Sequence, residues 1–340
     1  MSKLLSWSRW IFLSVVALVL TIACTQKPNV TAPASNSAPV TSSAQLVSGA
    51  VDWVGYSGYY VALKQGLFSQ AGLNNKEVVF KNPSDEITAL LAKQIDIAWM
   101  TSGDAIQSAA QDPSLKIVYL VDYSDGADGI LGRNITKPQD LKGKVLAREN
   151  VLAARVLLQA YLNQAKLTES DLKIKDLDFA AAATAFAAKQ VDLAVTFEPF
   201  LAKSAKQGGG QIIFSSKGTN LIADVLVVRD NLLQTRKQDL ETYIRAVDKG
   251  VKLVNAGDLD ALKIVANKMG GLSVADVQEQ LKGVKVFDLA SNKAIGFEKG
   301  NPNSLIGNLN LTAQAAVDFK MVSKPIKIES LYDESIVKSM

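Results

Sequence analysis

Histidine is absent from the 340-residue sequence, and cysteine occurs only once, as Cys24. These absences exclude Ser-His and Cys-His catalysis, histidine-ligated zinc and any disulfide within the chain. Strong positive charge is also lacking, because the net charge is only +4 and no dense Lys/Arg stripe occurs. Nucleic acid is therefore not expected as a partner. We expect a binding protein rather than an enzyme, with no metal and no cofactor.

The N-terminus has the features of a secretory signal. Lys3 and Arg9 supply a basic start, and residues 10–23 form an almost unbroken apolar stretch that is short for a membrane span. The stretch ends at Cys24, which resembles a lipoprotein signal, where the cysteine is acylated and begins the mature chain. Thr21 departs from that pattern, which usually has leucine at this place. The alternative is an uncleaved anchor with an incidental cysteine, and either form tethers the protein outside the cytoplasmic membrane.

Residues 1–23 are thus assigned to the signal, and residues 24–48 to a flexible tether whose Thr, Ala, Ser, Pro and Asn residues bury too little apolar surface to order the chain. From Gly49 onward, short apolar runs alternate with amphipathic helical patterns. This alternation predicts α/β lobes with largely parallel sheets flanked by helices. The expected strands are 50–52, 78–80, 95–100, 117–122, 144–147, 174–177, 191–196, 212–214 and 225–228. The expected helices are 59–67, 86–93, 105–110, 153–164, 180–189, 240–254, 259–269, 273–281 and 310–322, with Thr312 as a candidate N-cap.

An internal echo favours two lobes of similar topology. Ala89–Ala98 and Ala185–Ala194 are identical at six of ten positions, and each reads as a helix end, a Lys-Gln turn and a buried strand. Their spacing is too long for a solenoid repeat. Convergence on a common helix–turn–strand solution would also produce the echo, so it supports shared topology rather than duplication.

Six segments occur in a characteristic order: Gly55–Phe68, Thr101–Ala105, Asp122–Asp128, Asp140–Val145, Thr196–Pro199 and Asp224–Arg229. Together they resemble the periplasmic receptors of nitrate, taurine and aliphatic-sulfonate importers, the SsuA/THI5-like family, which also includes thiamine-precursor binders. The thiamine-pyrimidine synthases that share this fold use histidine and a cysteine cluster, and this chain has neither.

The resemblance implies a two-lobed periplasmic binding protein of type II, with parallel-rich sheets and two hinge crossings. Lobe one would take residues 49–122 and 225–340, and lobe two residues 125–222. The signal that ends at Cys24 predicts a lipid anchor at the periplasmic or cell-surface face of the cytoplasmic membrane, and we expect a monomer. Its partners would be a small-molecule ligand, an ABC permease and the ATPase of that permease.

Ligands of open α/β sheets bind beyond the carboxyl ends of the strands. Acidic and aromatic side chains follow several of the predicted strands, and two acids lie at the predicted hinges. The candidate ligand-binding residues are Trp53, Tyr56, Tyr59, Ser102, Asp104, Asp122, Glu149, Glu198 and Asp224.

Each candidate also has a structural explanation. Asp104 precedes a helix and could serve as its N-cap, and Glu149 could interact with a helix dipole. Glu198 could be a solvated turn residue before a proline, and Tyr59 could be a core residue. Asp128 is expected to form a turn rather than to bind ligand.

An acidic, aromatic cleft favours a small cation, because carboxylates bind N–H groups and an aromatic face stacks on the charge. An oxyanion site would be expected to recruit arginine, yet only Arg133 and Arg148 are near, and strand alternation points Arg148 away from Glu149. Guanidinium is planar with donors on every edge, and the Asp-Tyr-Ser-x-Gly-Ala-Asp sequence at residues 122–128 resembles receptors for guanidine- or urea-like compounds.

Two alternatives remain open. One is a receptor of the same fold for an anion such as taurine, an aliphatic sulfonate or nitrate. The other is a hydrolase in which Asp104 and Glu198 form a carboxylate pair.

Overall fold

The computed structural model describes residues 44–340. The predicted signal at 1–23, Cys24 and the predicted tether up to residue 43 lie outside the described residues. The prediction extends the tether too far, because residues 46–48 belong to a strand in which Leu46 and Ser48 are fully buried. The folded part therefore begins at Leu46 or before it.

Six strands form the first sheet, in the order β11-β4-β10-β3-β1-β2. β1 (Leu46–Val51) pairs in parallel with β2 (Asn75–Phe80) and β3 (Ile97–Thr101). β10 (Ala223–Arg229) runs antiparallel to β3 and to β4 (Leu115–Ser124), and β11 (Val284–Val286) adds to β4 in the same sense. This sheet and the helices that pack on it are called lobe one.

Five strands form the second sheet, in the order β7-β6-β8-β5-β9. β6 (Val145–Arg148) pairs in parallel with β7 (Lys173–Asp176) and β8 (Leu193–Phe197). β5 (Asp128–Gly132) runs antiparallel to β8 and to β9 (Gln211–Ser215). This sheet and its helices are called lobe two, and the chain passes between the lobes from β4 to β5 and from β9 to β10.

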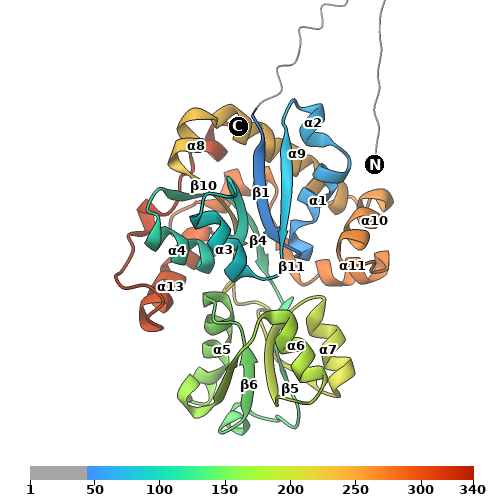
Figure 1. Ribbon diagram of the computed structural model, residues 1–340, viewed down its shortest axis with the longest axis vertical. Coiled ribbons are helices and arrows are strands. Elements are labelled where there is room, and N and C mark those ends of the chain that lie inside the picture. Colours follow the sequence, from blue (N-terminus) through green and yellow to red (C-terminus); the bar gives the residue numbers. More distant parts are fainter. Residues whose placement is uncertain (1–43) are drawn as a thin grey trace, which may run out of the picture. The chain divides into compact units, whose positions relative to one another are not determined.

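Helices flank both sheets (Figure 1). The helices of lobe one are α1 (Ser57–Lys64), α2 (Leu67–Gln70), α3 (Pro83–Leu91), α4 (Ser102–Gln111), α8 (Asp230–Thr235), α9 (Lys237–Asn255), α10 (Leu259–Lys268), α11 (Val274–Leu281), α12 (Leu289–Ser291), α13 (Leu305–Asp318) and α14 (Ser335–Ser339). Those of lobe two are α5 (Leu152–Gln164), α6 (Phe179–Ala187) and α7 (Phe200–Gly208). Ser304, not the predicted Thr312, is the N-cap of α13. Between residues 44 and 340, no helix combines the length and apolarity that crossing a membrane requires.

The two sheets follow one plan, and the internal echo falls on equivalent parts of it. The echoed segments are the α3–β3 and α6–β8 units. Lys93 and Lys189 end the helices with the same φ of 60°. Asp96 and Asp192 then accept hydrogen bonds from main-chain N–H groups of the neighbouring strands β1 and β6, at 2.8 and 2.9 Å. The Lys-Gln turn and the aspartate two residues after it thus fix the strand register in both lobes.

The predicted α/β class is confirmed, but the sheets are mixed rather than largely parallel. In each sheet, the strand that has just crossed from the other lobe enters antiparallel to its neighbours, β10 in lobe one and β5 in lobe two. β5 and β11 were not among the predicted strands. Gly129 and Gly132 weaken the strand pattern of β5, and β11 is only three residues long.

Two glycines bring α1 and α9 into close contact. A Cβ atom on Gly250 would lie 2.0 Å from the carbonyl oxygen of Gly58, which is backbone and cannot move aside. We therefore expect Gly250→Ala to lower the free energy of unfolding by about 1–3 kcal/mol, as overpacking typically does, measured by urea unfolding. Gly307→Ala is the control, because a Cβ on that α13 glycine has its nearest neighbour at 3.7 Å. Equal stability losses in the two variants would contradict the close-contact explanation.

Candidate functional site

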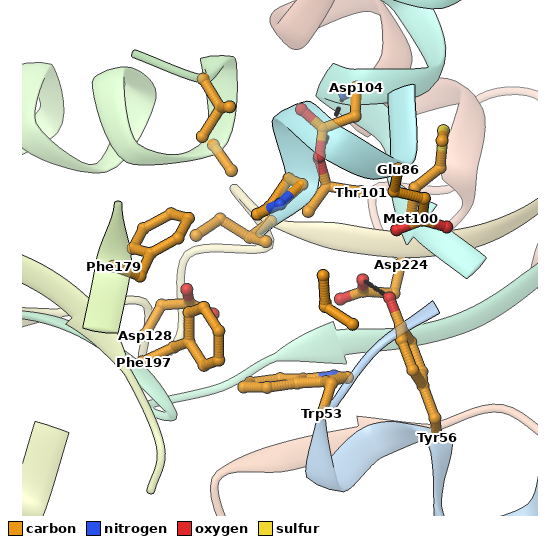
Figure 2. A pocket seen from close by; sticks show the side chains of 15 residues that line it. Trp53, Tyr56, Glu86, Met100, Thr101, Asp104, Asp128, Phe179, Phe197 and Asp224 are labelled. Carbon is orange, nitrogen blue, oxygen red and sulfur yellow. Dashed lines mark hydrogen bonds between the residues drawn. The ribbon is translucent and has the colours of Figure 1, made fainter. Parts of the chain in front are cut away.

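A small cavity lies where residues of both lobes meet, and it has a volume of about 40 Å³. One water needs about 10–15 Å³ by the same measure, so the space is that of a few waters. The cavity is lined by Val51, Trp53, Tyr56, Pro83, Glu86, Met100, Thr101, Asp104, Asp128, Val151, Ala153, Phe179, Phe197, Ile222 and Asp224. Figure 2 shows carboxylates and aromatic rings around it.

Trp53 and Tyr56 reach the cavity from the turn that follows β1, and each holds a buried carboxylate. Trp53 Nε1 donates a hydrogen bond to Asp122 Oδ2 at 3.1 Å, and the Tyr56 hydroxyl donates to Asp224 Oδ1 at 2.6 Å. Asp122 and Asp224 are paired across β4 and β10, the strands next to the two crossings. A Cβ on Gly55 would lie 2.1 Å from Asp122 Oδ2, so the turn needs glycine to approach this carboxylate.

Asp104 and Glu86 lie in the first turns of α4 and α3. The N-cap of α4 is Thr101, whose Oγ1 accepts a hydrogen bond from the Asp104 main-chain N–H and donates to Asp104 Oδ2 at 2.8 Å. Asp104 is therefore not the N-cap of this helix. Glu86 is 1% exposed and follows the N-cap Asn82. Both carboxylates point toward the cavity (Figure 2).

Lobe two contributes one carboxylate and two aromatic rings. Asp128 begins β5, Phe197 ends β8 and Phe179 begins α6. Phe197 packs edge-on against Trp53 of lobe one, with ring centroids 5.7 Å apart, and against Phe179 at 4.9 Å. The cavity thus has an aromatic wall that spans both lobes.

The carboxylates of this site lack positive partners. Glu86, Asp104, Asp122, Asp128 and Asp224 form no ion pair within residues 44–340, and no Lys or Arg of these residues lines the cavity. One oxygen each of Glu86, Asp104 and Asp122 is buried without any hydrogen-bond partner. Buried carboxylates in proteins are normally paired or protonated, so the charge of this set must be balanced by protons or by a bound cation.

Burial is the main cause of strongly perturbed ionisation in the site. It raises the pKa of Asp104, Asp128 and Asp224 to about 7 in each case. The pKa of Glu86 and that of Asp122 also lie well above the usual range, because of burial and then the charges of Asp104 and Asp224 respectively. Such perturbed acids gathered at a cleft indicate a functional site.

The predicted site residues fall into two groups. Trp53, Tyr56, Asp104 and Asp224 line the cavity, and Asp122 accepts a hydrogen bond from Trp53 without lining it. The other four do not line the cavity: Tyr59, Ser102, Glu149 and Glu198.

Tyr59 packs in an aromatic cluster, 4.7 Å from the ring of Trp99. Ser102 Oγ donates to Asn308 Oδ1 at 2.6 Å, which ties α4 to α13. Glu149 contacts α3 outside the cavity lining. Glu198 lines a separate hollow beside α7 and α11, so Asp104 and Glu198 do not face one space as a hydrolytic carboxylate pair requires.

Sequence reasoning missed Glu86, Asp128, Phe179 and Phe197. An acid in the first turn of a helix is common for electrostatic reasons, so Glu86 carried no distinctive signal. Asp128 was predicted to form a turn, yet it begins β5 and is 8% exposed. The two phenylalanines could have been found only from their positions, because Phe197 ends β8 and Phe179 follows the loop after β7, and ligands bind beyond the carboxyl ends of strands.

The two nearby arginines do not reach the cavity. Arg148 forms ion pairs with Glu169 and Asp176, at 3.2 and 2.7 Å. Arg133 donates to the carbonyl oxygens of Phe186 and Val191. Within residues 44–340, no group of three or more acidic or sulfur side chains is placed to hold a metal ion.

The chain matches the NMT1/THI5-like family over residues 53–257. A curated relative from Brucella abortus, named as a binding protein, is 21% identical over 285 residues, which are 83% of this chain and 87% of the relative. The alkanesulfonate-binding protein SsuA from Xanthomonas axonopodis pv. citri, solved with MOPS bound, has a TM-score of 0.72 at 20% identity and covers 85% of this chain and 98% of its own.

The same fold also carries enzymes. The desulfurization enzyme DszB has a TM-score of 0.61 at 14% identity, covering 87% of this chain and 98% of its own. At these identities the structural likeness establishes the fold, and the chemistry of the site must be judged from the residues of this chain.

Proposed function

The chain belongs to the NMT1/THI5-like family, and we propose from this that it is the extracytoplasmic solute receptor of an ABC importer, capturing a small nitrogen-rich cation such as guanidinium. It does no chemistry on the ligand. The observation that carries the proposal is the group of buried carboxylates, Glu86, Asp104, Asp122, Asp128 and Asp224, that have no cationic partner among the described residues. A bound cation supplies the missing charge.

The geometry favours a planar organic cation over a metal ion. Its acids come from α3, α4, β4, β5 and β10, and no three of the described residues form a metal-ligand set. Donors on several edges of one flat ion match acids on several sides, and one ring face, that of Trp53 or that of Phe197, suits the surface of such an ion. Guanidinium has four non-hydrogen atoms, which fits a cavity of about 40 Å³.

Delivery to a permease follows from the receptor role. Residues of both lobes line the cavity, so a ligand held there contacts both and favours the closed arrangement, which only differential affinity can do. The closed form would dock on the permease, whose ATPase drives uptake. Acylation of Cys24 would hold the receptor at the outer face of the cytoplasmic membrane, and the protein would act as a monomer.

Thermal melting of the purified protein with micromolar guanidinium tests the ligand. At about 100 times the dissociation constant, a ligand adds roughly 2.7 kcal/mol of stability, a shift of several degrees. Urea is the matched control, because it is planar and similar in size but uncharged. Taurine, an alkanesulfonate and nitrate test the anion alternative. A shift with an anion and none with guanidinium would refute the cation while leaving the receptor role in place.

A further inference from the structure

Glu149 is a carboxylate of lobe two that reaches lobe one. It follows β6 and is 6% exposed. Its Oε1 accepts a hydrogen bond from Oγ of Ser84, in the first turn of α3, at 2.8 Å. Its Oε2 is buried and has no hydrogen-bond partner. One oxygen of this side chain therefore joins the lobes, and the other remains unsatisfied at the same interface.

The charges around Glu149 are mostly of its own sign. The first turn of α4, which holds Asp104, lies against the chain just after Glu149, because a Cβ on Gly103 would be 3.0 Å from the Cβ of Leu152. Asp178, the N-cap of α6, also raises the pKa of Glu149 by its charge. Glu86 and Asp224 interact with Asp104 from within lobe one. Arg148 donates only to the main-chain oxygen of Glu149, because its guanidinium is paired with two other acids. Glu149 adds to the raised pKa of Asp104, after burial. An attraction through Ser84 and a repulsion from Asp104 thus act across the same contact.

We propose that Glu149 makes closure of the two lobes dependent on the charge of Asp104. When Asp104 is ionised and the cavity is empty, repulsion opens the Ser84–Glu149 contact. When Asp104 is neutralised, by a proton or by a bound cation, the repulsion is removed and the contact closes. Glu149 is then a positioning residue that favours the closed arrangement only for a positively charged ligand. The cation part of this inference rests on the proposed function, whereas the proton part does not.

Two substitutions at this contact should act in opposite directions. Glu149→Gln keeps a carbonyl oxygen that accepts from Ser84 but removes the negative charge, so the ligand-free protein should close more readily. Ser84→Ala removes the hydroxyl donor and leaves the main-chain N–H of Ser84 and the repulsion, so the attraction is weaker and the protein should open. If Glu149 contributed only packing, the two substitutions would not shift closure in opposite directions, and the effect of Glu149 on closure would not depend on pH.

The distance between spin labels on the two lobes measures closure. Lys81 lies three residues before Ser84, Lys175 pairs with Ala147 just before Glu149, and both are exposed. Labels are placed on Lys81→Cys and Lys175→Cys in the full-length chain with Cys24→Ala, at pH 8 and pH 5.5. The exposed Glu329 supplies the matched control, Glu329→Gln.

In the ligand-free protein at pH 8, Glu149→Gln is expected to raise the short-distance population relative to the long one about tenfold, which corresponds to about 1.4 kcal/mol. The wild type should shift the same way at pH 5.5, Ser84→Ala should shift to longer distances, and Glu329→Gln should not shift. An unchanged distribution in Glu149→Gln at pH 8 overturns the inference. Guanidinium is added to the wild type separately, so a failure of the cation proposal shows in that arm alone.

Discussion

The substitution Glu86→Gln is expected to weaken guanidinium binding and, at the same time, to make the ligand-free protein more stable. Removing one partner of a buried, hydrogen-bonded charge pair costs about 2–5 kcal/mol, so the affinity should fall by about 30-fold or more. Without ligand, the same carboxylate is 1% exposed, has an unpartnered oxygen and lies near Asp104 and Asp224. Because the substitution removes this unfavourable buried carboxylate, it should raise the free energy of unfolding at pH 8 by about 1 kcal/mol or more.

Titration calorimetry measures the affinity in this test, and urea unfolding measures the stability. Asp85→Asn is the matched control, because Asp85 lies in the same helix turn but is exposed. It removes one negative charge without touching the cavity, so the affinity should not change. Its carboxylate accepts a hydrogen bond from the N-cap Asn82 at 3.0 Å, so the stability should fall by up to about 1 kcal/mol, which is opposite in sign to the gain expected for Glu86→Gln. Glu86→Gln that binds guanidinium as tightly as the wild type would contradict the assignment of Glu86 to the site.

Lowering the pH from 8 to 6 is expected to weaken guanidinium binding at least about tenfold. Guanidinium keeps its charge over this range, whereas Asp104, Asp128 and Asp224 have pKa values of about 7. The cation binds the ionised carboxylates, so affinity falls as the pH drops below 7, by a factor of about ten per unit of pH for each carboxyl that must lose its proton.

The stability of the ligand-free protein should change in the opposite direction. The pKa of each of these acids is higher in the folded state than in the unfolded state. Their contribution is therefore fully present below the unfolded pKa and is lost as pH rises through about 7, by about 1 kcal/mol per carboxyl between pH 6 and pH 8. Melting and calorimetry at both pH values check the pair of trends. A fall of both affinity and melting temperature at pH 6 would indicate general acid damage instead.

Local sequence patterns predicted most of the fold because the lobes repeat a unit with strong local signals. The Lys-Gln turn between a helix and a buried strand can be recognised in the amino-acid sequence, and its two copies occupy equivalent positions in the lobes. The direction of β5 and β10 was not predictable from such patterns, because it depends on which sheet a strand joins after crossing. That is a property of the whole chain path rather than of any short segment.

The site was predicted only where strand ends or the predicted hinges pointed to it. Trp53 and Asp104 follow β1 and β3, as the rule on carboxyl ends expects, and Asp224 was predicted as a hinge residue and lies at the start of β10. Glu86 is the first residue of the predicted helix 86–93, where nothing distinguishes a buried acid from an exposed one. Tyr59 was predicted to bind ligand because it follows a strand, but an aromatic residue at that place can equally pack in the core, and Tyr59 packs on Trp99.

The position of the acids on separate helices and strands bears on how inorganic cations compete with the ligand. Outside a cell, Na⁺ and K⁺ exceed any scarce organic nitrogen compound by many orders of magnitude, and a compact acidic cluster would be filled by them. Here no three of the described acids are placed to hold a metal ion, and the proposed ligand is a flat ion with donors on its edges. Discrimination of this kind depends on shape and not on total charge, and buried contacts are screened little by added salt. Under the proposed function, added NaCl should therefore compete only weakly with guanidinium for the site.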